Sequence, residues 1–268
     1  MKLLSACLLF VLAGCAGQTV ERSAQAPTIV SLNPCADAIL AEVASPGQLL
    51  AISHYSHSPS ASSMNVDTAA RFASTGGTAE EVIALAPDVV VGDIFMPPAT
   101  RAALERAGIR VEQVGIVGSL ADSDAQIRQL ATIAGKESAG EQLVSRIAAA
   151  WDAAGDDGAK VDTLLWQDGG IVPGDQSLAL AMLEQVGFAS HSAARGLGQG
   201  AYLPLEQVLA DPPQLVLASG NERMLTHPTL GALKDVRYET FDSALLYCGG
   251  PTIPRALTRL LQIRASLQ

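Results

Sequence analysis

The sequence predicts an α/β protein of two Rossmann-like lobes, each with a mostly parallel sheet, bridged by a single long α-helix. Short apolar strands alternate with helices from residue 28 onward, which is the pattern of repeated βα units. The stretch 122–154 then carries no strand signal, and the alternation resumes after the GDDG sequence at 155–158. At 268 residues, the chain is long enough for two domains of ordinary size.

The N-terminal lobe is predicted to span residues 28–136. Its clearest strand is the unbroken apolar run at 88–92, which is typical of a strand buried on both faces of a parallel sheet. Thr78 and Glu81 have the spacing of a capping box, and they start a helix that ends before Pro87. We expect further strands at 28–32, 49–53 and 110–116, and further helices at 36–44 and 99–108.

The linking helix is predicted at 137–155 and the C-terminal lobe at 156–268. Leu143, Ile147 and Trp151 follow one another at intervals of four residues, which places them on one stripe of a helix. A helix from about Ser138 to Ala154 would be about 25 Å long. In the C-terminal lobe we expect strands at 161–167, 214–219 and 236–241, and helices at 178–187, 204–210 and 251–267.

Composition and motifs exclude several classes of function. The net charge of −10 and the lack of a basic cluster argue against binding to nucleic acid or to an anionic membrane surface. The sequence has no GxSxG, HExxH or P-loop motif, and its GLGQG run at 196–200 follows no clear strand, so we expect a flexible loop there. The chain is therefore not expected to be an enzyme. Because aromatic residues make up only 4% of it, rings near a cleft carry weight.

The N-terminus has the pattern of an export signal. Lys2 precedes an apolar run of about a dozen residues, too short to span a bilayer. The run ends in LAGC, residues 12–15, which resembles the lipobox of bacterial lipoproteins and predicts a lipid on Cys15. Residues 1–15 would then be the signal peptide and 16–27 a polar tether. The alternative is an ordinary secretory signal, cut after the small-x-small triplet at 24–26.

Two cysteines, Cys35 and Cys248, remain in the exported chain. An even pair in an oxidising compartment favours a disulfide bond. Two unrelated buried thiols are the alternative. A thiolate metal site is the least favoured reading, because exported metal sites usually show more clustered ligands.

One short pattern occurs twice in the chain, once in each lobe. EEVIALAPDVVV at 80–91 and LEQVLADPPQLVL at 205–217 both describe a short helix, a proline break and a buried strand. Glu80 and Glu206 occupy matching positions in the first turn of each helix, where the helix dipole favours a carboxylate.

From about Thr28 to the C-terminus, the chain resembles the periplasmic-binding proteins that serve ABC importers of vitamin B12, ferric siderophores and haem. The segments that carry this resemblance are IVSLNPCADAILAEV, SHYSHSP, TAEEVIALAPDVVV, PLEQVLADPPQLVLASG and GGPTIPRAL. The resemblance implies two α/β lobes joined by one long helix, with the ligand in the cleft between them.

The implied function is that of a periplasmic lipoprotein that captures a metal chelate, either a corrinoid such as vitamin B12 or a ferric siderophore. It would deliver the chelate to the permease dimer of an ABC importer in the inner membrane. The resemblance implies no cofactor beyond this ligand, and we expect a monomer that touches the membrane through its lipid. The alternative is a haem- or metal-binding periplasmic lipoprotein that acts without a transporter.

The resemblance also gives the repeated glutamates a role. In the family, one glutamate on each lobe docks onto basic pockets of the permease, and the matching residues here are Glu80 and Glu206. The alternative is that both are only favourable first-turn acids, each worth about 0.3–1 kcal/mol.

Ligands of open α/β sheets bind at the carboxyl ends of the strands. Pro34 and Tyr55 match ligand-facing positions of the B12-binding relative, and Tyr202 lies where the family often has a ring. Trp166 ends a strand, and a place in the core is an equally good reading for it. The ligand-binding residues that we expect are Pro34, His54, Tyr55, Phe95, Trp166, Tyr202 and Tyr247.

His54 and His57 flank Tyr55 and could ligate haem or a metal ion, but a solvated polar loop is the favoured reading, and we expect no metal site. The chain also departs from the B12-binding relative. Gly76 or Gly77 and Thr252 stand where that relative has a tryptophan and an arginine, which weighs against vitamin B12 itself and against anionic siderophores.

Overall fold

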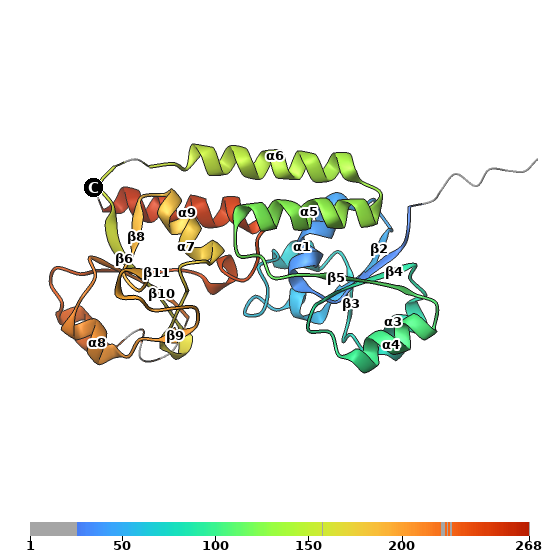
Figure 1. The fold of residues 1–268 in the computed structure, drawn as a ribbon, viewed down its shortest axis with the longest axis horizontal. Helices are drawn as coiled ribbons and strands as arrows, with labels where there is room; N and C mark the ends of the chain where they lie inside the picture. Colours follow the sequence, from blue (N-terminus) through green and yellow to red (C-terminus); the bar gives the residue numbers. More distant parts are fainter. Residues whose placement is uncertain (1–25, 157, 221–222, 224, 226, 268) are drawn as a thin grey trace, which may run out of the picture.

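The computed structural model describes residues 26–156, 158–220, 223, 225 and 227–267. The predicted signal peptide, with Cys15, lies outside these residues. Figure 1 shows two α/β lobes side by side, with a layer of long helices along one edge of the molecule. The predicted fold class is therefore confirmed.

The N-terminal sheet is entirely parallel. Its order within the described chain is β3-β2-β1-β4-β5. The apolar run of β4 lies in the middle of the lobe, with Val89, Val90 and Val91 almost completely buried, as expected for a strand covered on both faces. The strand bounds are β1 Ile29–Ser31, β2 Leu49–Ser53, β3 Ala73–Thr75, β4 Val89–Asp93 and β5 Arg110–Val114.

The helices of this lobe begin where the sequence provides caps. The Asn33 side chain accepts the amides of Cys35 and Ala36, and Pro34 occupies the first turn, where its missing N–H costs no helical hydrogen bond. The helices are α1 Pro34–Val43, α2 Val66–Ala69, α3 Ala79–Leu85 and α4 Pro98–Arg106, with a 3-10 turn, η1, at His54–His57.

The capping box predicted before α3 forms only in part. The Thr78 hydroxyl accepts the amide of Glu81 at 3.3 Å, as expected. The Glu81 carboxylate instead accepts the Thr75 hydroxyl at 2.9 Å and the Gly76 amide at 2.6 Å. Glu81 therefore ties the helix to the end of β3, because two hydrogen bonds from these donors stabilise the carboxylate more than one from the backbone amide of Thr78 would.

The C-terminal sheet is mixed. Its order in the described residues is β11-β10-β6-β7-β9, with β8 paired to β6. Strand β7 is antiparallel to both neighbours, and the other pairs are parallel. The strands are β6 Val161–Gln167, β7 Ile171–Val172, β8 Phe188–Ser190, β9 Ala201–Tyr202, β10 Leu215–Ser219 and β11 Arg237–Thr240. The helices are α7 Leu178–Gln185, α8 Leu205–Ala210 and α9 Thr252–Ser266, and 3-10 turns lie at Asp168–Gly170, Ala193–Arg195, Pro228–Ala232 and Ser243–Leu245.

Two long helices lie along one edge of the molecule, and the second of them connects the lobes. Helix α5 (Leu120–Ala134) packs on α1, and α6 (Glu137–Ala153) packs on α5 and α1 of the first lobe and on α9 of the second (Figure 1). Gly140 permits the close contact with α5, because a Cβ there would lie 2.4 Å from the Cβ of Ala131. Helix α6 ends two residues before the predicted end of the linking segment.

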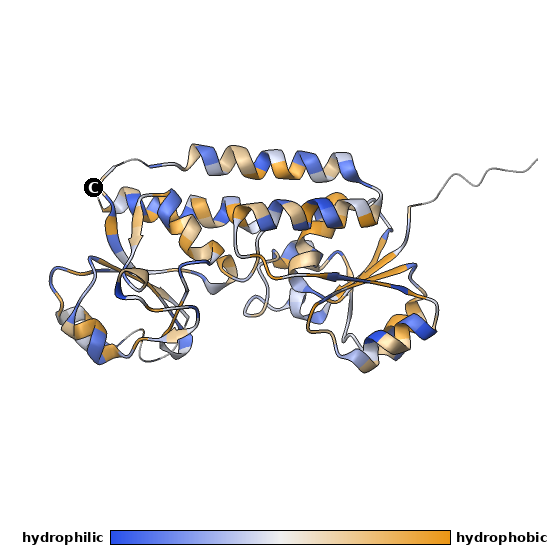
Figure 2. Ribbon diagram, in the orientation of Figure 1, coloured by the Kyte–Doolittle hydropathy of each residue, from blue (hydrophilic) through white to orange (hydrophobic). Residues whose placement is uncertain are grey.

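One hydrophobic core continues from lobe to lobe through these helices. It contains Ile29 of β1, Ile147 of α6, Leu217 of β10 and Ile263 of α9. Figure 2 shows the hydrophobic colour concentrated on the strands of the N-terminal sheet. Among the described helices, none has both the length and the apolar character needed to cross a bilayer.

Candidate ligand cleft between the lobes

A cavity of about 560 Å³ lies between the two lobes. Its N-terminal wall is the loop that follows β5, where Ile116 is 73% exposed. Its C-terminal wall comes from the end of β6, the loop before α7, α7 itself and the GLGQG loop. The residues that line it are Ile116, Val117, Gly118, Gln167, Pro173, Asp175, Gln176, Ser177, Leu178, Ala179, Met182, Gln199, Leu246, Tyr247 and Cys248.

A second cavity of about 180 Å³ extends this space along the first lobe. It shares Ile116, Val117, Tyr247 and Cys248 with the larger cavity and adds Ile94 and Phe95 from the loop after β4. The Asp93 carboxylate accepts the amide of Phe95 at 2.8 Å and so fixes the backbone of that loop. The larger volume lies in the range of small-molecule sites, which is roughly 300–1,000 Å³.

Residues 242–255 are here called the interlobe strap, and residues 246–249 of this strap line the space. Cys248 of the strap is bonded to Cys35 at the start of α1, in the first lobe. Three hydrogen bonds to the first lobe accompany the disulfide: Tyr247 Oη to the Ser60 carbonyl (3.0 Å), Gly250 N–H to Ser123 Oγ (2.9 Å) and Arg255 Nη1 to the Ser63 carbonyl (2.6 Å). The linking helix is thus accompanied by a second connection, which is covalent and engages both cysteines of the described residues.

Some of the aromatic side chains expected at the cleft line it, and others do not. Tyr247 lines both cavities, and Phe95, 71% exposed, lines the smaller one and a further hollow against α4. Tyr55 and Tyr202 are exposed at the ends of β2 and β9 but line neither cavity. Pro34 is half-buried in the first turn of α1, next to the disulfide.

Trp166 does not face the cleft, which corrects the expectation of a ligand contact. It is completely buried among the apolar side chains of the second lobe, with Leu164, Val208 and Val216 in the same cluster. Its indole N–H donates to the carbonyl of Leu203 at 3.0 Å. In this lobe the alternation of β6 turns the tryptophan into the core.

A buried carboxyl group supports the turn that carries Tyr55. Asp37 of α1 is completely buried, and its Oδ2 accepts the amide of Ser53 at 2.9 Å and the hydroxyl of Ser56 at 2.6 Å. Burial raises the pKa of Asp37 to about 7, although the hydrogen bonds from the serines oppose this shift. The sequence offered no signal for this contact, because the residue stands within an apolar helix.

The histidines form no metal cluster. His54 is exposed and lies against the Tyr55 ring, with the ring centroids 4.0 Å apart, and its Nδ1 is 3.3 Å from the Thr75 carbonyl oxygen. In the residues described, no three side chains of His, Cys, Asp or Glu gather closely enough to hold a metal ion.

The sequence profile of the periplasmic binding protein family matches residues 29–239. The chain belongs to this family. No curated protein sequence matches it significantly.

Solved structures of periplasmic binding proteins share its fold. The periplasmic heme-binding protein RhuT from Roseiflexus sp. RS-1 is 21% identical, with a TM-score of 0.70 over 90% of this chain and 98% of that one. The heme-binding protein HutB of Vibrio cholerae is 17% identical, with a TM-score of 0.72 over 88% and 98%. The vitamin B12 binding protein BtuF of Vibrio cholerae is 16% identical, with a TM-score of 0.65 over 91% and 99%.

In this periplasmic binding protein, Glu80 and Glu206 belong to α3 and α8, which lie on separate lobes. Each is exposed in the first turn of its helix, α3 or α8, on the side of the molecule away from α6 (Figure 1). In the described part of the chain, no hydrogen bond or ion pair engages either carboxylate.

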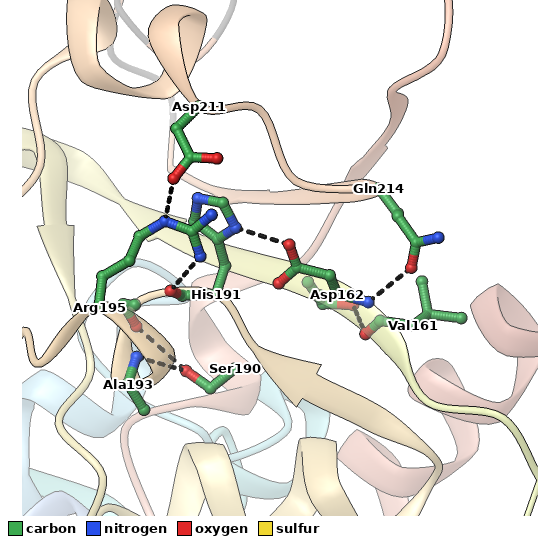
Figure 3. A network of polar contacts seen from close by, with 10 residues as sticks. Val161, Asp162, Ser190, His191, Ala193, Arg195, Asp211 and Gln214 are labelled. Atoms are coloured by element: carbon green, nitrogen blue, oxygen red, sulfur yellow. Dashed lines mark hydrogen bonds and ion pairs between the residues drawn. The ribbon is translucent and has the colours of Figure 1, made fainter.

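A polar network that the sequence did not predict holds α8 in place (Figure 3). Asp211, which ends α8, binds the Arg195 Nε at 2.6 Å, and this hydrogen bond lowers the pKa of the carboxyl group. Arg195 also donates to the carbonyl of His191 at 2.9 Å. The His191 ring is buried, with its Nδ1 2.9 Å from Asp162 of β6. The helix that carries Glu206 is thereby tied to the central strand of its lobe.

Proposed function

We propose that this periplasmic binding protein captures a metal chelate, a corrinoid or a ferric siderophore, and delivers it to the permease dimer of an ABC importer. The observation that carries the proposal is the interlobe cavity, which is lined from both lobes and has exposed apolar side chains at Phe95, Ile116 and Tyr247. A flat macrocycle or a compact chelate buries apolar surface against such side chains, and the surrounding polar groups orient it.

Haem is the second candidate ligand. Two of the similar structures named above are described as heme-binding proteins, and the exposed pair of His54 and Tyr55 offers side chains of the kind that ligate haem iron. In that case the protein would be a haem- or metal-binding periplasmic lipoprotein that acts without a transporter.

Delivery to the permease would rest on Glu80 and Glu206. Both carboxylates are exposed and unpaired among the described contacts, and the helices that carry them lie on separate lobes, so each can meet one subunit of a dimer. The competing interpretation is that each acid only stabilises its own helix.

We further propose that the chain is exported by its N-terminal signal and anchored by a lipid on Cys15. The tether at 16–27 would then connect the anchor to the first strand. Labelled palmitate incorporation by the wild type but not by Cys15→Ser supports the anchor, and equal labelling of both chains contradicts it.

Titration of the purified protein with a corrinoid, a ferric hydroxamate and haem, followed by visible absorption, tests the ligand class. We expect one chelate to bind at a ratio of one per chain, with weaker binding by Tyr247→Ala. Loss of a ring that a bound chelate would cover should cost about 1–3 kcal/mol of binding free energy. Binding of none of these chelates would contradict the proposed function.

A further inference from the structure

The described residues that line the interlobe space include negative but no positive side chains. Of the described residues that line the two joined cavities, Asp93 and Asp175 are charged, and none is lysine, arginine or histidine. The whole chain also carries a net charge of −10. A carboxylate on a ligand would therefore enter a negative field without a counter-charge, after losing part of its hydration.

The uncharged polar groups of the larger cavity include three side-chain amides, here called the amide wall. Gln167 is the last residue of β6, Gln176 precedes α7 and Gln199 belongs to the GLGQG loop. All three line the same space. A side-chain amide both donates and accepts hydrogen bonds, so it matches another amide or a hydroxyl group on a ligand. Within the described contacts, the side chains of Gln167 and Gln176 have no hydrogen-bond partner in the protein.

This amide wall is held in place by the loops that carry it. The Oε1 of Gln199 accepts the amide of Gly174 at 2.9 Å, which leaves the NH₂ group of Gln199 as a donor. A Cβ on Gly174 would lie 2.6 Å from the backbone nitrogen of Gln199, so the two loops pack against each other. On the other side of the space, a Cβ on Gly118 would lie 3.2 Å from the carbonyl oxygen of Gln176, which brings the first lobe close.

We infer that the cleft selects chelates whose periphery is uncharged and rich in amides or hydroxyls, and that it discriminates against chelates that carry carboxylates or other anionic groups. The inference rests on the proposed function and narrows its substrate class. Discrimination follows because an unpaired ligand charge costs more than a hydrogen-bonded neutral group in the same place.

Two matched ligand pairs test the inference by calorimetry or visible titration. The first is a corrinoid with intact peripheral amides and its monocarboxylate derivative. The second is a neutral ferric trihydroxamate and a trianionic ferric tricatecholate. In whichever pair binds, we expect the neutral member to bind about tenfold or more tightly than the anionic member. A factor of this size corresponds to the repulsion from one unscreened like charge at moderate distance.

A charge introduced on the amide wall should reverse this preference. Gln176→Lys, at an exposed position, should raise the affinity for the carboxylate derivative by about tenfold and lower that for the amide form. Gln262→Lys, at an exposed position on α9 outside both cavities, adds the same charge as a matched control and should leave both affinities unchanged. Far-UV circular dichroism of both variants establishes that each is folded.

Failure of ligand selectivity and failure of chelate capture give different results. Equal or tighter binding of the anionic member, or no change in preference with Gln176→Lys, would overturn the inference and leave chelate capture in place. Binding of neither member of either pair would overturn both.

Discussion

Asp37 is a buried acid whose charge the fold disfavours. Its pKa rises from 3.8 to about 7 on folding, mainly through desolvation. The native state therefore binds more protons than the unfolded state between about pH 4 and pH 7, so this residue lowers the free energy of unfolding as the pH rises through that window. Below pH 4 the group is protonated in both states and contributes no pH dependence.

Asp37→Asn should remove this pH dependence. The asparagine Oδ1 can still accept from Ser53 and Ser56, and it carries no charge to desolvate. Relative to the variant, the wild type should lose up to about 4 kcal/mol of stability between pH 4 and pH 8, by the free energy that corresponds to the raised pKa. Urea unfolding at both pH values measures the difference, and parallel pH profiles would contradict the buried, protonated carboxyl group.

The buried Trp166 side chain gives a second prediction. Because the ring fills the core and its N–H satisfies the Leu203 carbonyl, Trp166→Phe should cost about 1–3 kcal/mol of unfolding free energy. Chelate affinity should stay within twofold of the wild type, since the side chain is absent from the cavity walls. If Trp166→Phe reduced chelate affinity more than Tyr247→Ala does, Trp166 would contact the ligand after all.

Helices α3 and α8 are the elements on which delivery depends. Reversing one charge with Glu80→Lys should leave the fold and the chelate affinity nearly unchanged, because the side chain is exposed in the first turn of α3. Uptake of the chelate by cells should fall sharply, since a like charge at a docking contact costs several kcal/mol.

Glu137→Lys provides the matched control for this prediction. Glu137 is also an exposed first-turn glutamate, but it starts α6, on the opposite edge of the molecule. If both acids only stabilise their helices, the two variants should behave alike. Normal uptake by cells that carry both Glu80→Lys and Glu206→Lys would remove the importer from the proposal.

Helices and strands with a strong local sequence pattern could be predicted from the sequence. Strands that form only by pairing with neighbouring strands could not. The apolar runs of β4, β6 and β10 predicted buried strands because both faces are covered. Strands β7 and β9 have two residues each and exist only through their pairing with β6 and with each other. Helix α5 lacked a clear predicted start, although Ser119 caps it.

In the candidate site, too, some residues could be predicted from the sequence and others could not. Sheet topology places residues after strand ends near a cleft, so Tyr247 and Phe95 could be predicted. The side-chain direction of Trp166, the burial of Asp37 and the gathering of Gln167, Gln176 and Gln199 depend on tertiary packing, for which a single sequence offers no period or motif.

At the scale of the whole molecule, three features hold the lobes together: helix α6, the continuous core and the disulfide from Cys35 to Cys248. We therefore expect binding to change the radius of gyration only slightly. A large change in solution scattering on addition of ligand would contradict this arrangement.

The disulfide contributes separately from the helix. It closes a long loop, and its removal in Cys35→Ser/Cys248→Ser should cost about 2–5 kcal/mol of unfolding free energy. Because Cys248 and Tyr247 line the cavity, chelate affinity should also fall. A double variant with unchanged stability and affinity would show that the strap needs no covalent bond.

We propose that the space between the lobes captures a metal chelate in the periplasm. The most direct measurement is the visible absorption spectrum of the protein purified from its native cells, together with the mass of the molecule released on denaturation. We predict a chelate band at up to one equivalent per chain, reduced in Tyr247→Ala isolated in the same way. A colourless protein that releases no metal complex, even after growth with corrinoid, ferric hydroxamate and haem, would contradict chelate capture.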